Sequence, residues 1–88
     1  MLTNKSIRLH SKCLNVLEAI QTLNNRIATH EHGLKNGYLH YMMMYNHYQS
    51  RIVIDKAISK RLQRYYNRLL IQISQVVINE SEKELHHV

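Results

Sequence analysis

The residues best suited to chemistry are five cations that recur at helical spacing in the second half of the chain. They are Lys56, Lys60, Arg61, Arg64 and Arg68. On a helix these cations would lie opposite the apolar stripe centred on Leu62, at a pitch that can follow a phosphate backbone. The alternative interpretation is that these cations have no binding role and are solvated on the outer face of the helix. Asp55 is the only acid between residues 38 and 79, so the usual mixture of charges is missing, which favours binding to an anionic partner.

Tyrosines form a second feature near these cations. Tyr65 lies beside the basic face and is suited to stacking on an exposed base. A stripe of tyrosine and methionine comes earlier, at Tyr38, Tyr41, Met42, Met43, Tyr45 and Tyr48. It could stack bases or adapt to a groove in a protein. Packing against a partner helix is the stronger interpretation, because tyrosine supplies apolar area while its hydroxyl stays at the wet rim.

Seven histidines and one cysteine raise the question of a metal site, but their spacing argues against one. No two histidines stand four residues apart, the spacing that lets one helix hold an ion between two rings. Cys13 is separated from His30 by about 25 Å along a single helix, so the two cannot share an ion. We therefore predict neither a metal nor a cofactor.

Arg26 and His32 are separated by five residues. This spacing resembles the Arg-to-His motif of the helical HEPN ribonuclease family, with Ile27 where that family usually has a polar residue. The resemblance implies acid–base chemistry on RNA, with both side chains beside a phosphate across a dimer interface. Other enzyme classes have no motif here, because a Gly-rich phosphate loop, a serine elbow and paired carboxylates are all missing. We predict a protein that is not an enzyme and keep the ribonuclease as a remote alternative.

Two ladders of mainly apolar residues define the elements that must position these groups. Their members alternate in steps of three and four, which keeps one stripe of a helix apolar and is typical of a coiled coil. The first ladder is Leu2, Ser6, Leu9, Cys13, Val16, Ile20, Leu23, Ile27, His30 and Leu34. The second is Tyr41, Tyr45, Tyr48, Ile52, Asp55, Ser59, Leu62, Tyr66, Leu69, Ile73 and Val76.

The ladders predict an all-α chain folded as an antiparallel helical hairpin. The chain has no proline and two glycines, so little interrupts helix besides the turn between the ladders. Helix one is expected over about residues 3–32, with Thr3 or Asn4 capping its start. Gly33 is expected to end it in the left-handed conformation.

Helix two is expected over about residues 38–79, longer than helix one, so that its last part overhangs. A break near residues 46–59 is the alternative, and it would give a three-helix bundle. Residues 80–88 lose the apolar stripe and are expected to fray as an acidic tail.

The chain is expected to form one domain, residues 1–88, whose small core calls for an added source of burial. Apolar residues off the ladders, such as Leu14 and Ile71, need cover, so we predict a homodimer that forms a four-helix bundle. Asp55 and Ser59 would then set the register of the helices. Cys13 on an apolar stripe, with no secretory leader and no long apolar run, predicts a cytoplasmic protein without a membrane segment.

The net charge of +6 is unevenly distributed along the chain. Residues 38–79 hold six cations and one acid, which favours a polyanionic or acidic partner. We predict a non-enzymatic helical module that docks on nucleic acid or a nucleoprotein through the basic face of helix two. The alternative is a protein-interaction or assembly component that uses the Tyr/Met stripe and the apolar residues 71–78. A phage or mobile-element inhibitor of a host nucleoprotein, such as a CRISPR effector, would be one form of either.

Overall fold

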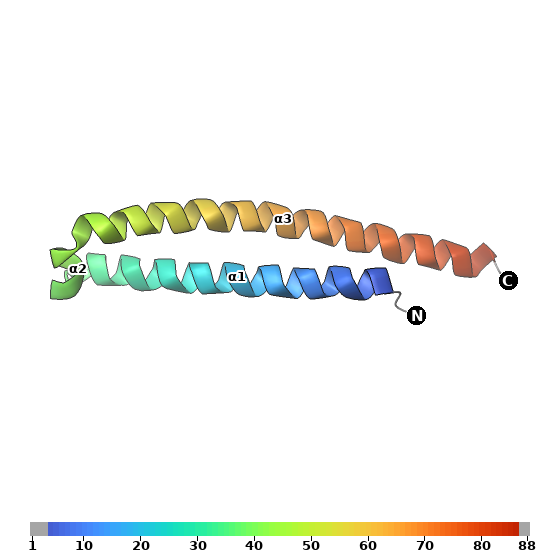
Figure 1. Cartoon of the computed structure of the whole chain (residues 1–88), viewed down its shortest axis with the longest axis horizontal. Coiled ribbons are helices and arrows are strands. Elements are labelled where there is room, and N and C mark those ends of the chain that lie inside the picture. The colour runs from blue at the N-terminus through green and yellow to red at the C-terminus, as the bar shows by residue number, and fades with distance from the viewer. Residues whose placement is uncertain (1–3, 87–88) are drawn as a thin grey trace.

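The computed structural model describes residues 4–86, which form three helices and no strand. α1 spans Asn4–Lys35, α2 spans Leu39–Met43 and α3 spans Tyr45–His86. The all-α prediction is therefore confirmed for this part of the chain. α1 and α3 lie side by side and run in opposite directions, with α2 at the end where they join (Figure 1). The molecule is a rod of 68 × 17 × 16 Å.

The two ladders face each other along this rod. Every described member of the first ladder is buried or half-buried, and Leu2 lies outside the described residues. In the second ladder, Tyr45 is the one exposed member, at 44% of its full surface. The heptad pattern therefore predicted the interface between the helices almost residue by residue.

The apolar core is a thin strip along the rod, and Ile20, Leu23, Ile27 and Ile52 are buried in its middle and toward the turn. Near the open end, opposite the turn, Leu9, Cys13 and Leu69 form a buried centre, and Cys13 is a free thiol. Partly buried side chains that pack against this centre are Val16, Tyr66, Ile73 and Val76. Toward the turn, the buried ladder positions of α3 include the polar residues Asp55 and Ser59.

The predicted role of Gly33 as the end of helix one is wrong. α1 continues to Lys35, and Gly33 is buried within it. A side-chain carbon on Gly33 would overlap the ring of Tyr41, which packs against the backbone at this point. Gly33 is thus needed for close approach of an aromatic ring rather than for a left-handed conformation.

Gly37 ends α1 in its place. Its φ is +66°, in the left-handed region. The amide of Gly37 donates to the Leu34 carbonyl at 3.3 Å, and the amide of Tyr38 donates to the Gly33 carbonyl at 3.2 Å. This pair of bonds is a Schellman motif, which satisfies carbonyls that the helix end would otherwise leave unpaired.

The second helix is interrupted at Met44 rather than within residues 46–59. Met44 has φ −119° and ψ 34°, which separates α2 from α3. Helical hydrogen bonds flank the break, from the Met42 amide to the Tyr38 carbonyl and from the Tyr48 amide to the Met44 carbonyl. Residues 46–59 are continuous helix, so α3 is not divided in two.

α3 continues to His86, past the end predicted near residue 79, and residues 87–88 of the predicted frayed tail lie outside the described residues. The acidic segment is rich in glutamate, a good helix former, so the helix continues without an apolar stripe. This end of α3 extends past the start of α1 (Figure 1).

The two glycines should respond differently to alanine. Gly33→Ala should lower the free energy of unfolding by about 1–3 kcal/mol, because the new methyl group must displace the Tyr41 ring. The same change in a Tyr41→Ala background should cost clearly less. Gly37→Ala should cost about 1–2 kcal/mol in either background, because its strain lies in the backbone. Urea unfolding followed by circular dichroism measures all of these, and a Gly33→Ala cost that is independent of Tyr41 would contradict the assignment.

Candidate functional site

The five predicted cations all lie on α3, and all are exposed. Lys56 Nζ is 2.7 Å from Glu31 Oε1 on α1, so its charge is already paired. The other four, Lys60, Arg61, Arg64 and Arg68, form no ion pair with the described residues. Four of the five predicted charges are therefore available to an external anion.

The five cations do not share one face. A helix turns about 100° per residue, so each step of four residues rotates the side chain by about 40°. From Lys56 to Arg68 the rotation adds up to about 120°. Lys56 consequently points toward Glu31 on one side of the helix pair, while Arg68 lies toward the other side.

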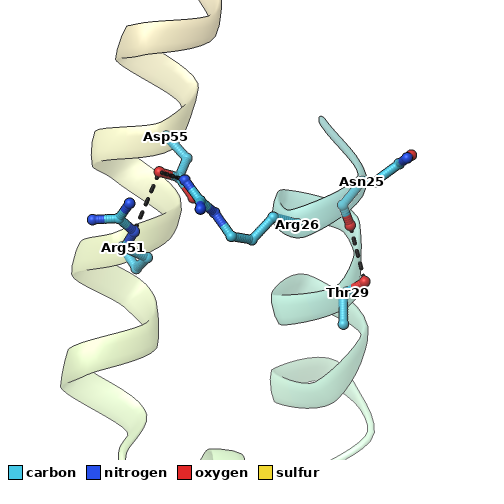
Figure 2. A network of polar contacts seen from close by, with 5 residues as sticks. All are labelled: Asn25, Arg26, Thr29, Arg51 and Asp55. Atoms are coloured by element: carbon cyan, nitrogen blue, oxygen red, sulfur yellow. Dashed lines mark hydrogen bonds and ion pairs between the residues drawn. The ribbon is translucent and has the colours of Figure 1, made fainter. Parts of the chain in front are cut away.

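Contacts between α1 and α3 define these two sides. On the first, Glu31 meets Lys56, and we call this side the Glu31 flank. On the second, Arg26 and Arg51 meet Asp55, and we call it the Arg26 flank (Figure 2). Tyr65 stands two heptads after Arg51 and so lies on the Arg26 flank. The Arg68 guanidinium carbon is 5.9 Å from the centre of the Tyr65 ring, a cation–π contact that places Arg68 beside that flank.

The Tyr/Met stripe is divided between the interior and the surface. Tyr41 and Tyr48 are half-buried and their ring centres are 4.5 Å apart. His30 of α1 packs on Tyr48 with 4.8 Å between ring centres, and the Tyr48 hydroxyl is 2.6 Å from His40 Nε2. The exposed members, which remain available for a partner, are Tyr38, Met42, Met43 and Tyr45.

The strongest polar contact between the helices involves Asp55, which has no exposed surface. Arg26 donates two hydrogen bonds to the Asp55 carboxylate, from Nε to Oδ2 at 2.8 Å and from Nη2 to Oδ1 at 2.9 Å (Figure 2). Arg51 Nε lies 3.3 Å from Oδ1, one helical turn before Asp55. The ladder predicted that Asp55 would be buried, but no local spacing in the sequence indicated Arg26 as its partner.

This arrangement controls the ionisation of Asp55. Hydrogen bonds from Arg26 lower the pKa of Asp55 below its usual 3.8, and burial acts in the opposite direction. The positive charges of Arg26 and Arg51, with a smaller effect of His30, also lower this pKa. The carboxylate in turn raises the pKa of Arg26. Both groups are therefore charged at neutral pH.

Ser59 forms a second polar contact on the Glu31 flank. Its hydroxyl donates to Asn24 Oδ1 of α1 at 2.9 Å and accepts from Gln63 Nε2 at 3.1 Å. Both off-pattern residues of the second ladder are thus buried and hydrogen-bonded within one chain, which removes most of the penalty for burying them.

The two residues of the HEPN-like spacing lie in different surroundings. The Arg26 guanidinium is committed to Asp55. His32 lies near the end of α1, where its ring nitrogens contact the Asn36 amide and the Tyr38 hydroxyl. Six residues along a helix rotate a side chain by about 240°, so the two side chains point in different directions.

Within residues 4–83, whose side chains the structure describes, no three side chains of His, Cys, Asp or Glu come close enough together to hold a metal ion. The same residues include no helix that is long and apolar enough to cross a membrane.

Comparisons of this chain with protein-family models, with curated proteins and with solved structures found no match.

The Asp55 contact predicts a specific pH dependence of stability. Asp55→Asn should lower the free energy of unfolding by about 1.5–3 kcal/mol at pH 7, because it removes charge-assisted hydrogen bonds. Since the folded pKa lies below 3.8, the ionised carboxylate stabilises the fold above that pH and loses its effect as the pH falls further. The gap between wild type and variant should therefore narrow below pH 3.8.

Thermal unfolding across a pH series measures this gap. Glu18→Gln is the matched control, because Glu18 is an exposed acid. A gap between wild type and Asp55→Asn that stays constant into the acid range would show that the Asp55 charge contributes nothing to stability.

Proposed function

We propose that this chain is a non-enzymatic helical module that binds nucleic acid or a nucleoprotein through basic residues of α3. The observation that carries this proposal is the set of four exposed cations on α3 with no acidic partner among the described residues. Unpaired cations along a stiff helix attract a polyanion, and binding releases the counterions that had surrounded the polyanion.

Two further observations support a non-enzymatic role in the cytoplasm. Arg26, one of the two residues of the HEPN-like spacing, donates both of its hydrogen bonds to Asp55, so its guanidinium serves the fold. Cys13 is a buried free thiol, which suits a reducing compartment.

The proposal includes a homodimer that forms a four-helix bundle. On the Glu31 flank, Leu17 and Leu70 extend the lines of Asn24 and Gln63 by one heptad, and Leu14 lies beside them. Leu14 is 62% exposed and Leu70 42% exposed. We infer that a second copy of this chain covers this surface. The core between two helices is thin, and a four-helix bundle formed by two copies would enlarge it.

A protein-interaction or assembly role is the second candidate. Its support is the exposed apolar tip around α2, where Leu39 is 75% and Met43 is 76% exposed. Methionine adapts to irregular apolar grooves, so this tip suits a protein partner. An inhibitor of a host nucleoprotein would combine this tip with the exposed cations of α3.

Salt dependence separates the two candidates. Anisotropy titrations with labelled DNA and RNA should show affinity that falls steeply with salt, with a log–log slope of about −0.7 to −0.9 per phosphate contact. Arg61→Gln with Arg64→Gln should weaken binding and flatten this slope. The control is Lys35→Gln with Lys83→Gln, which lowers the net charge equally at two exposed positions away from Arg61 and Arg64. Absence of binding at low salt would favour the second candidate.

The dimer is tested by a pair of adjacent substitutions. Leu70→Glu should raise the dimer dissociation constant about tenfold or more, because it places a charge in the bundle interface. Ile71→Glu should leave the constant nearly unchanged. Ile71, which the sequence suggested would need cover, is turned about 100° away from Leu70 and so lies off the Glu31 flank. Sedimentation equilibrium measures both variants. A monomeric wild type, or equal effects of the two changes, would rule out this interface.

A further inference from the structure

Cations of α1 lie on the same side of the helix pair as Arg61 and Arg68 of α3. Lys5, Lys12 and Arg26 stand at multiples of seven residues, so they share one edge of α1. At the turn end, Arg26 meets Asp55 on the Arg26 flank. At the open end, Lys5 lines a surface depression together with Gln72 of α3, which stands one heptad after Tyr65. Contacts near both ends therefore place the α1 cations on the Arg26 flank.

Arg8 joins this edge because it stands three residues after Lys5 and four before Lys12. On α3, Arg61 and Arg68 stand four residues before and three after Tyr65, so they border the same flank. Arg8, Lys12, Arg61 and Arg68 are exposed. The flank is thus lined by cations from two helices that are far apart in sequence.

The pairing of the helices interleaves these cations along the rod. Contacts of Arg26 with Asp55, of Asn24 with Ser59 and of Glu31 with Lys56 show that residues at one level have numbers that add up to about 84. From the open end toward the turn, the order is Arg8, Lys12, Arg68, Arg61, Arg26 and Arg51. At about 1.5 Å per residue, this line extends over about 37 Å in steps of roughly 5–10 Å.

No exposed acid of the described residues lies in this line. Glu18 is exposed, but it stands one heptad before Asn25 on the outer face of α1, away from α3 (Figure 2). Glu82 is exposed near the end of α3, beyond Arg8. Asp55 is buried beneath Arg26 and Arg51, which leaves that group with a net positive charge. Glu31 lies on the opposite flank, where it pairs with Lys56. Glu80 borders a second depression that Lys5 also lines, so Lys5 is left out of the line, which starts at Arg8.

We propose that the Arg26 flank, with cations from both helices, is the binding surface, and that its ligand is a single strand of nucleic acid. This inference rests on the proposed nucleic-acid binding and identifies the strand type and the α1 residues. A duplex carries its phosphates on a helical path, so a straight line of cations meets only those on its near side. A single strand is flexible and can extend along the whole line. Tyr65, 37% exposed beside Arg68, supplies a ring on which a base can stack.

The test uses three double variants of the full chain, each of which lowers the net charge by two, together with Tyr65→Ala. Arg8→Gln with Lys12→Gln changes the α1 line, and Arg61→Gln with Arg64→Gln changes α3. Lys35→Gln with Lys83→Gln, two exposed lysines outside this line, is the matched control. Each is titrated by anisotropy with labelled single-stranded and duplex DNA and RNA over a salt series, after circular dichroism has shown unchanged helicity.

Arg8→Gln with Lys12→Gln should reduce the slope of log affinity against log salt concentration for single strands by about 1.4 in magnitude, because each phosphate contact contributes about 0.7. Wild type should prefer single strands, Tyr65→Ala should weaken that preference, and the control should keep the wild-type slope. An unchanged slope in the α1 variant, with weaker binding in the α3 variant, would overturn this inference and leave nucleic-acid binding by α3 in place. A duplex preference would overturn the strand type, and no binding by wild type at low salt would overturn both proposals.

Discussion

A buried carboxylate that must be paired is the constraint on which the packing of the two long helices depends. Asp55 has no exposed surface, and an unpaired charge in such a place is expensive. Apolar ladder residues do little to select a register, because leucine, isoleucine and valine pack against one another in many combinations. The Arg26 guanidinium reaches Asp55 in only one alignment, and the bond from Ser59 to Asn24 supports the same alignment. These two contacts fix which residues of α1 face which residues of α3, and therefore which charges share a flank.

Much of the fold could be predicted from sequence because its main determinant is periodic. The ladders located the buried edge of each long helix, including the buried positions of Cys13, Asp55 and Ser59. The errors fell where a local rule competes with packing. A glycine near a helix end suggests a cap, but at Gly33 the missing side chain makes room for the ring of Tyr41. The Schellman hydrogen bonds form at Gly37 instead. Likewise, the loss of the apolar stripe after residue 79 indicates less packing, yet glutamates keep that segment helical.

The sequence predicted the part of the candidate site that depends on spacing within a single helix, but not the part that depends on how two helices align. Spacing within α3 identified the exposed cations, but a repeat of four residues winds around a helix, so Lys56 and Arg68 lie toward opposite flanks. The pairing of Lys56 with Glu31, and the common flank of Arg8 and Arg61, depend on the alignment of two helices. No spacing within either helix contains that information. Arg26 illustrates the same limit, because its spacing to His32 resembles a ribonuclease motif while its actual partner lies 29 residues away.

The position of the turn has a consequence for the order in which the molecule folds. Polar contacts at Asp55 and Ser59 close loops of 29 and 35 residues, whereas the apolar centre joins Cys13 to Leu69 across a longer one. Loop-closure entropy rises with loop length, so contacts near the turn form at lower entropic cost. We therefore expect pairing to begin beside the turn and to extend toward the open end, and local unfolding to start at the open end and stop at the Arg26–Asp55 contact. Amide exchange would then be graded along each helix, slowest near the contact that carries the buried charge.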